Sequence, residues 1–462
     1  MDGPGAADQS LPDDGPSGAA IGVEKLDDFC SAQWRNRSRH ILVLSSAGKP
    51  IYTRYGSETQ LSTLMSAVQA IISSFSDMSD PVRSLSTDTH TIVFFTSGPL
   101  YLLAASDRRD PEELLLGELQ LVHSQIVSIL TLAQLTKIFE QRSNFDLRQL
   151  LGGTEGIIDQ LVDRLDTDFG FALGSLDTLW IRYRLRERIG KVLLAHRPKG
   201  LLYAMVVTRD AKLVTLLRPR RHSLHPADLH LLFNMATSQT FTRGEHWTPV
   251  CLPRFNDQGF LHVYINYTTP NAALVLLSAD RDSFFVMSRY RESVCQELAA
   301  DESLQRLEDA AIQQALHPRE LGIAVGQLLQ LYYRHKTLVQ HFGTRFDNSV
   351  PADQQRRIIG TYKRLRLHMA KGTTQKPLRI VYCRHDSDSS EGIPGSLIAM
   401  LVIGIIVSLA AIVWCFLTSC VGKEVLLYFR RRREQRQQER QGWMPLPQHQ
   451  EWTPIPQHHG DN

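Results

Sequence analysis

The chain contains 462 residues, of which 43% are hydrophobic and 21% charged, so it can bury a large core and has the length of about three domains. The 51 Lys and Arg residues nearly balance the 48 Asp and Glu residues, which leaves a formal net charge of +3. This balance argues against a whole-chain nucleic-acid binder, because no broad positive potential is available. The six cysteines show no C-x-x-C spacing, which argues against a structural zinc site and a disulfide framework.

The N-terminal segment, residues 1–37, is predicted to be disordered and acidic. Residues 1–30 hold seven acids against the single basic residue Lys25, with Gly, Pro and Ser between them. Such a composition buries too little apolar surface to offset the entropy lost on ordering. No apolar run follows a basic start, so the sequence shows no secretory signal and the expected location is cytoplasmic.

A first α+β unit is predicted over residues 38–166. Alternating apolar residues, turn residues and helical spacing indicate the order β-β-α-β-β-β-α, with Ser57 as the N-cap of the first helix. The expected strands are 41–44, 51–55, 82–86, 91–95 and 100–104, and the expected helices are 58–75 and a long one at 111–136. This order is typical of a sheet covered or flanked by helices.

A second unit of similar size is predicted over residues 167–300, and an incomplete third one over residues 301–385. Around the second unit we expect helices at 144–165, 180–195, 225–236 and 282–298, with strands at 201–208, 213–217, 260–266 and 272–278. The third stretch offers an apolar segment near 323–325, a helix at 351–369 and a strand at 378–382. It is too short to be a complete copy of the first unit.

One transmembrane helix is predicted at residues 394–421. No charged residue occurs over 392–422, and the 26 residues 396–421, as a helix with a rise of about 1.5 Å per residue, reach about 39 Å, enough to cross a bilayer core of about 30 Å. A buried core helix is the alternative. The last segment, 422–462, is a basic, Pro-rich tail, either disordered or able to dock as a polyproline helix.

Motifs for covalent chemistry are missing from the sequence. The Gly48-Lys49 pair lacks the earlier glycine and the following Ser or Thr of a phosphate loop, and neither G-x-S-x-G nor H-E-x-x-H occurs. We therefore expect no catalytic residue, no metal site, no cofactor and no enzyme activity. The basic residues Arg218, Arg220 and Arg221 form a cluster that could bind phosphoinositide head groups, with a solvated loop as an equal alternative.

Several segments resemble the Mon family of vacuolar fusion proteins, also called the SAND family. The similarity begins in the first hairpin and covers about residues 38–383. The segments that carry it are 41–58, 98–100, 123–128, 144–151, 249–256 and 259–260. The resemblance implies three longin-like domains, of which the third is truncated here, because the family's last domain continues where this chain passes into the apolar segment.

The resemblance also implies a function and partners. Members pair through the first longin domain with a Ccz-type subunit, and the heterodimer is a guanine nucleotide exchange factor for a Rab-seven-class GTPase. Such a factor binds the nucleotide-free GTPase more tightly than the loaded one and so lowers its affinity for GDP by linkage. The implied setting is endosome maturation and fusion with the vacuole or lysosome. There the chain would be a peripheral protein of late endosome, vacuole and lysosome membranes.

Within residues 41–75, five side chains are selected as contacts for the partner or the GTPase. They are Lys49, Tyr52, Arg54, Tyr55 and Glu58. The alternative is a hairpin that only stabilises the fold.

The apolar segment leaves a second function open, a membrane-anchored longin-type trafficking scaffold without exchange activity. The basic residues 430–433 favour the cytoplasmic side, which would place the N-terminal part outside the cytosol. Either the tail is translocated or the C-terminal segment comes from a joined exon.

Overall fold

The computed structural model describes residues 34, 37–56, 61–77, 82–108, 110–219, 222–313, 329–335 and 337–372. The predicted strand 378–382, the apolar segment 394–421 and the tail 422–462 lie outside these residues, as does most of segment 1–37. Ser57, Glu58, Arg220 and Arg221 also lie outside them.

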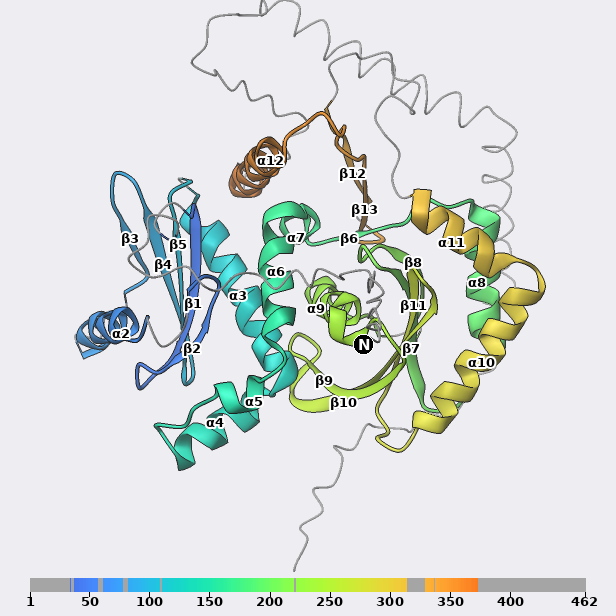
Figure 1. The fold of residues 1–462 in the computed structure, drawn as a ribbon, viewed down its shortest axis with the longest axis horizontal. Coiled ribbons are helices and arrows are strands. Elements are labelled where there is room, and N and C mark those ends of the chain that lie inside the picture. Colours follow the sequence, from blue (N-terminus) through green and yellow to red (C-terminus); the bar gives the residue numbers. More distant parts are fainter. Residues whose placement is uncertain are drawn as a thin grey trace, which may run out of the picture. The chain divides into compact units, whose positions relative to one another are not determined.

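The first sheet has five antiparallel strands in the order β2-β1-β5-β4-β3 (Figure 1). Its strands are β1 (Arg39–Ser45), β2 (Pro50–Thr53), β3 (Ser84–Ser86), β4 (Thr91–Ser97) and β5 (Leu100–Ser106). Side chains alternate between the two faces of a strand. Ile41 and Val43 therefore belong to the core shared with α3 (Glu112–Ile129), and Leu42 and Leu44 to the core shared with α2 (Ser62–Asp77). The predicted strands and first helix are confirmed.

The single long helix predicted at 111–136 is wrong. The structure instead has α3, ending at Ile129, and α4 (Leu132–Gln141), bent by 80° relative to it. The hydroxyl of Thr131 accepts a hydrogen bond from the Gln134 N–H at 3.2 Å, and this N-cap starts a new helix. The helix predicted at 144–165 is likewise split, into α5 (Arg148–Leu151) and α6 (Glu155–Thr167).

The second sheet repeats the strand order of the first, as β8-β7-β11-β10-β9, and all its pairs are antiparallel. Its strands are β7 (Leu201–Thr208), β8 (Leu213–Leu217), β9 (Glu245–Leu252), β10 (Asn256–Thr269) and β11 (Ala272–Ser278). The helix α9 (Pro226–Thr237) and the short 3-10 helix η1 (Gln239–Phe241) follow β8. Core residues of α9 cover one face of the sheet, while those of α8 (Tyr183–Ala195), α10 (Phe284–Ala300) and α11 (Ser303–Gln313) cover the other.

The strand β9 was not predicted from the sequence. It contains Pro249 and begins with the polar residues Glu245 and His246, which do not read as a central strand. It is the last strand of the sheet order, and a proline is tolerated at a sheet edge because no neighbouring strand needs its missing N–H. The edge position therefore explains why the composition was misleading.

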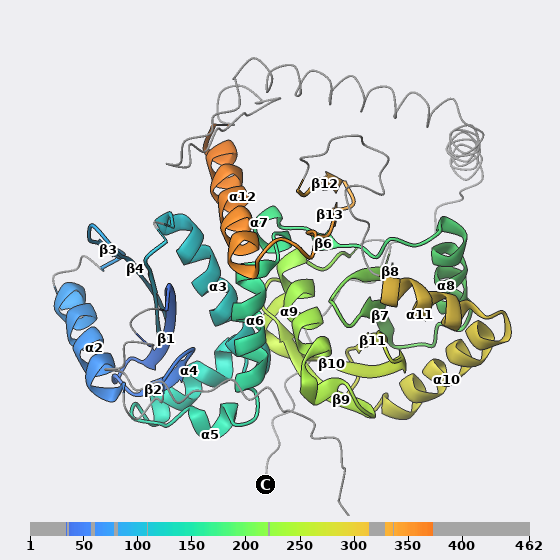
Figure 2. The same cartoon turned by 45° about the horizontal axis from the view of Figure 1, so that its top comes forward.

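A buried amide joins the two five-stranded units. Asn234 in α9 is fully buried, and its Nδ2 donates to Gln125 Oε1 of α3 at 3.1 Å and to the Ile157 carbonyl of α6 at 2.8 Å. From α6, Gln160 Nε2 returns a bond to the Asn234 carbonyl at 3.1 Å. Helices α6 and α9 lie side by side in both views (Figures 1 and 2). This junction is buried and specific in its hydrogen bonding.

The last described elements form a small sheet and a long helix. The sheet has the order β12-β13-β6, from β12 (Tyr332–His335), β13 (Gln340–Gly343) and β6 (Leu176–Asp177), and β13 runs parallel to β6. The helix α12 (Ala352–Gly372), predicted at 351–369, is confirmed and contacts α3, α6 and the short α7 (Gly170–Leu173) (Figure 2). The three strands are only two to four residues long, so their alternation gave no usable signal.

Among the described helices, none is by itself long and apolar enough to cross a bilayer, although the bent pair of α3 and α4 satisfies the length and composition test together.

Candidate functional site

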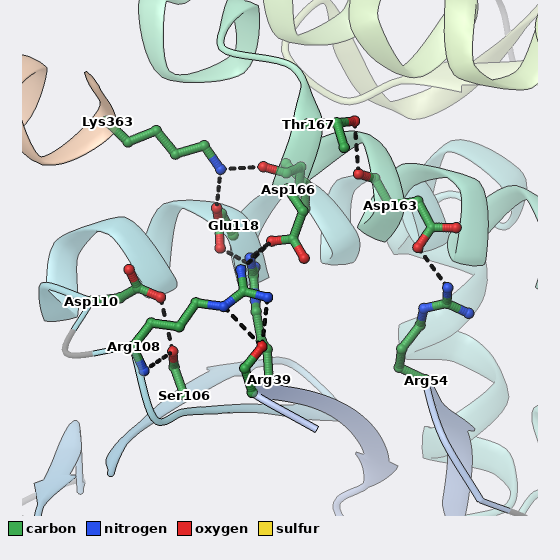
Figure 3. Close-up of polar contacts among 12 residues, drawn as sticks. Arg39, Arg54, Ser106, Arg108, Asp110, Glu118, Asp163, Asp166, Thr167 and Lys363 are labelled. Atoms are coloured by element: carbon green, nitrogen blue, oxygen red, sulfur yellow. Dashed lines mark hydrogen bonds and ion pairs between the residues drawn. The ribbon is translucent and has the colours of Figure 1, made fainter. Parts of the chain in front are cut away.

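Two of the predicted hairpin residues, Tyr52 and Arg54, face α6 of the same chain. Tyr52 is 1% exposed, and its hydroxyl donates to Asp159 Oδ1 at 2.6 Å. Arg54 is 6% exposed and pairs through Nη2 with Asp163 Oδ1 at 2.5 Å, and through Nη1 with Asp159 at 3.3 Å. Figure 3 shows the Arg54–Asp163 pair. Both side chains therefore tie the end of the hairpin to α6.

The charges of this contact agree with its geometry. Burial, reinforced by the Asp159 carboxylate, raises the pKa of the Tyr52 phenol well above its usual value, so it remains a donor. Burial is the largest single effect and by itself would lower the pKa of the Arg54 guanidinium, but Asp163, Tyr52 and Asp159 together outweigh it and the pKa is raised. At neutral pH the contact is thus a neutral phenol and a charged guanidinium against two acidic side chains.

Two other predicted residues are only half-buried and lie at the rim of this contact. The Lys49 ammonium donates to the Asn144 carbonyl at 2.7 Å. The ring of Tyr55 has the guanidinium of Arg37 4.8 Å and that of Arg54 5.1 Å from its centroid, within the range of cation–π attraction. Tyr55 and Lys49 present partly exposed surface, whereas Tyr52 and Arg54 do not. The binding role of the hairpin stays a prediction.

A second group of charges, which we call the Glu118 cluster, lies beside the hairpin and joins four elements (Figure 3). Its members are Arg39 of β1, Arg108 after β5, Glu118 of α3, Asp166 of α6 and Lys363 of α12. Glu118 accepts from Arg39 through Oε2 and from the Lys363 ammonium at 3.0 Å through Oε1. Arg39 also reaches Asp166 at 2.7 Å, and Arg108 reaches the same carboxylate oxygen at 3.1 Å.

The centre of the Glu118 cluster is withdrawn from water. Side-chain exposures are 6% for Arg39 and Glu118 and 5% for Lys363. Burial would raise the pKa of Asp166, but Arg39 and Arg108 outweigh burial and lower it. Lys363 additionally donates to the Leu165 carbonyl at the end of α6. Buried charges are stable only when they are paired. Removing one member of the cluster would therefore leave its partners buried with an unpaired charge, which destabilises the fold.

The hairpin contact and the Glu118 cluster position elements and offer no reactive group. Each of their carboxylates accepts hydrogen bonds from cations or a phenol, and within the described ranges no group of three or more metal-ligating side chains occurs. The arrangement is chemically suited to fixing β1, β2, α3, α6 and α12 against one another.

Comparison with known proteins places the chain in a family. The model described as "First Longin domain of FUZ, MON1 and HPS1" matches residues 39–161, and that described as "Second Longin domain of FUZ, MON1 and HPS1" matches residues 199–296. The chain is 36% identical to "Protein SAND" of Takifugu rubripes over 362 residues, which covers 78% of this chain and 69% of that protein. The chain belongs to the MON1/SAND family.

Further members show a similar level of identity. "Vacuolar fusion protein MON1 homolog A" of Bos taurus is 35% identical over 82% of this chain and 68% of its own length. "Vacuolar fusion protein MON1" of Cryptococcus neoformans is 35% identical over 74% of this chain and 56% of its own. A solved chain described as "MglB with tetrameric arrangement" aligns with 29% of this chain and 98% of its own at 18% identity and a TM-score of 0.23. The two family models show two longin domains in this chain, the first two of the three that the resemblance implied.

Sequence reasoning about this MON1/SAND chain missed the acidic partners of the hairpin. Asp159, Asp163 and Asp166 follow one another at helical spacing in α6, and residues four and three apart lie on one helix face. Three acids on a face opposite Ile158, Leu161 and Leu165 were the available signal. Their basic partners could not be identified, because these lie 58 to 127 residues away in the sequence.

The predicted phosphoinositide cluster can be followed only at Arg218. This residue lies directly after β8 and is exposed, while Arg220 and Arg221 lie outside the described residues. The phosphoinositide assignment stays a prediction.

Proposed function

We propose that this chain is the MON1-type subunit of a heterodimeric guanine nucleotide exchange factor, paired with a Ccz-type subunit and acting on a Rab-seven-class GTPase. Relatives that are 34–36% identical are named SAND or vacuolar fusion protein MON1. Family membership across both longin domains is the observation that carries the proposal. The setting is trafficking at endosome and vacuole or lysosome membranes, including vacuolar fusion.

The mechanism needs no covalent step. An exchange factor binds the empty GTPase more tightly than the GDP-bound form, and this difference weakens GDP binding by the same factor. A surface can hold a GTPase in one form only if it is itself firmly held. The contacts of Tyr52 and Arg54 with α6 brace the first hairpin, which supports a role for its partly exposed residues Lys49 and Tyr55 in binding.

The proposal also includes association with the membrane. The basic residues Arg218, Arg220 and Arg221 attach the complex to phosphoinositide head groups, each charge contributing about 1 kcal/mol near an anionic surface. We further propose that β12, β13 and α12 belong to a third longin-like domain, and that the apolar segment 394–421, which lies outside the described residues, anchors the chain in the membrane.

The deciding experiment measures release of fluorescent GDP from the Rab-seven-class GTPase by the purified full chain with its Ccz-type partner. We expect release at least about tenfold faster than from the GTPase alone, within the usual range of allosteric coupling. If the two subunits pair but release is not accelerated, the exchange function is refuted and the scaffold without exchange activity replaces it.

Two variants separate binding from folding in the same assay. Replacing Tyr55 by Ala removes a half-buried ring at the rim and should slow exchange, while Tyr52→Phe removes only an internal hydroxyl and should leave exchange unchanged in the folded protein. Equal exchange rates in both variants would remove the hairpin from the proposed contact surface.

A further inference from the structure

A polar cavity of about 580 Å³ lies between the first longin domain, the second longin domain and the small sheet. Its walls come from α6, from the turn between β7 and β8, from the end of α9 and from β12 and β13. This volume is within the range of sites that hold small molecules. None of the hairpin residues or members of the Glu118 cluster lines it.

The cavity carries more positive charge than its own carboxylates neutralise. Arg164 pairs with Asp168 at 3.0 Å, yet its Nη1 is buried without a hydrogen-bond partner. Lys212 stands 3.7 Å from Asp177, beyond hydrogen-bond distance. The remaining two cations of the wall, Arg209 and Arg345, make no ion pair within the described part of the chain.

Unpaired acceptors lie in the same wall. Asp177 Oδ1 is buried and has no hydrogen-bond donor among the described residues, although buried polar atoms are normally paired. Burial raises the pKa of this carboxyl, with Lys212 compensating only in part. The exposed Asp210 follows Arg209 in the turn between β7 and β8. The cavity thus offers donors for an anion and acceptors for hydroxyl groups at the same time.

This combination selects a class of ligand. Inorganic phosphate would use only the cations and would be repelled by the carboxylates. A neutral polyol would use the carboxylates but leave Arg209 and Arg345 unpaired. A molecule with both phosphate and hydroxyl groups satisfies both sets, because guanidinium groups bind phosphate oxygens and carboxylates accept from hydroxyls.

We propose that this cavity binds a phosphorylated polyol, with its phosphate on Arg209, Lys212 and Arg345 and its hydroxyl groups on Asp177 and Asp210. The site is separate from the Arg218 cluster in its residues, and it does not depend on exchange activity. The same chemistry occurs in soluble sugar or inositol phosphates and in the head group of a phosphoinositide lipid.

The first test is titration calorimetry on the purified full chain with inositol trisphosphate, inorganic phosphate and myo-inositol. We expect saturable binding of inositol trisphosphate, at least about tenfold weaker binding of inorganic phosphate, and none of myo-inositol. The double variant R209Q/R345Q should bind inositol trisphosphate more weakly, by about tenfold or more, since charge-assisted hydrogen bonds to phosphate are lost. Asp177→Asn should weaken the binding of inositol trisphosphate but not the binding of inorganic phosphate.

The matched control is Arg289→Gln, an exposed arginine of α10 that does not line the cavity. It should bind inositol trisphosphate like the unchanged chain, and thermal unfolding should show that all variants are folded. Absence of saturable binding, or an equal affinity in R209Q/R345Q and R289Q, overturns the proposal.

Vesicles identify the source of the ligand. We compare sedimentation with phosphatidylcholine vesicles that contain or lack phosphatidylinositol phosphate. Binding that inositol trisphosphate displaces and R209Q/R345Q abolishes assigns a lipid head group, and binding of the soluble probe alone assigns a soluble ligand; both support the site. Vesicle binding that is lost in R218Q and kept in R209Q/R345Q, without any soluble binding, overturns it in favour of the Arg218 surface.

Discussion

Lys363 is the member of the Glu118 cluster through which α12 is fixed to the first longin domain, and its replacement by Met should loosen that helix. The substitution keeps the apolar stem but removes the bonds to Glu118 at 3.0 Å and to the Leu165 carbonyl. Glu118 retains Arg39, so its charge remains paired. The expected cost is therefore that of charge-assisted hydrogen bonds, about 1.5–3 kcal/mol.

Replacing Glu118 by Gln should cost more than K363M. It leaves the Lys363 ammonium, 5% exposed, with only a carbonyl acceptor, and breaking a buried pair in this way costs about 3–5 kcal/mol. In the double variant no charge of this pair remains. Its cost in stability should therefore be smaller than the sum of the two single costs, by about 1 kcal/mol or more.

Hydrogen exchange over residues 352–372, together with urea unfolding, measures these costs. K363M should reduce protection in α12 more than in the second sheet. The matched control is Arg306→Met, which breaks an exposed pair with Glu302, with exposures of 63% and 78%, and should change stability by less than about 0.5 kcal/mol. An effect of K363M as small as that of R306M, or a smaller effect of E118Q than of K363M, would refute the reasoning.

Three further predictions concern other buried groups. Burial lowers the pKa of His230 to about 4 and outweighs the hydrogen bond from Nε2 to the Ser175 carbonyl, which favours the protonated ring. An unfolded histidine protonates near 6.5, so the unfolded state binds more protons and stability should fall as pH drops from about 6.5 toward 4, by about 2 kcal/mol at pH 5. Urea midpoints should show this fall, and H230Q should lessen it. Asn234→Leu should cost about 2–4 kcal/mol, since donors and acceptors of both longin domains lose their partner; unchanged thermal unfolding would contradict this. Tyr52→Phe should cost about 1 kcal/mol through the lost bond to Asp159, and a stability gain in denaturant titration would show that this bond does not stabilise the fold.

The two sheets could be predicted because their information is local. Runs such as 41–44 and 272–278 are apolar on both faces, and each is covered by helices on both sides. The strand β9 was not predicted because its edge position tolerates Pro249. The break between α3 and α4 was not predicted because it depends on one hydroxyl, that of Thr131. Local signals of this size are smaller than the apolar periodicity around them.

The candidate site was predicted only in part, for a different reason. The sequence selected the hairpin, but it could not show that Tyr52 and Arg54 point inward, because their partners Asp159 and Asp163 are more than 100 residues away. The same holds for the polar cavity, whose Arg209 and Arg345 belong to segments that meet only in the folded chain. Pairing over such distances follows from packing and has no pattern in a single sequence.

The contact between α12 and the first longin domain also sets an order of events during synthesis. Lys363 is separated from Glu118 by 245 positions and from Leu165 by 198. While the ribosome makes the intervening residues, the emerging first domain carries Glu118 with Arg39 as its cation and without the ammonium of Lys363. Contacts between distant positions form late because the loop they close costs entropy. During this interval the first domain must therefore be stabilised by its own core alone. The contact with α12 forms only after the second domain has left the ribosome.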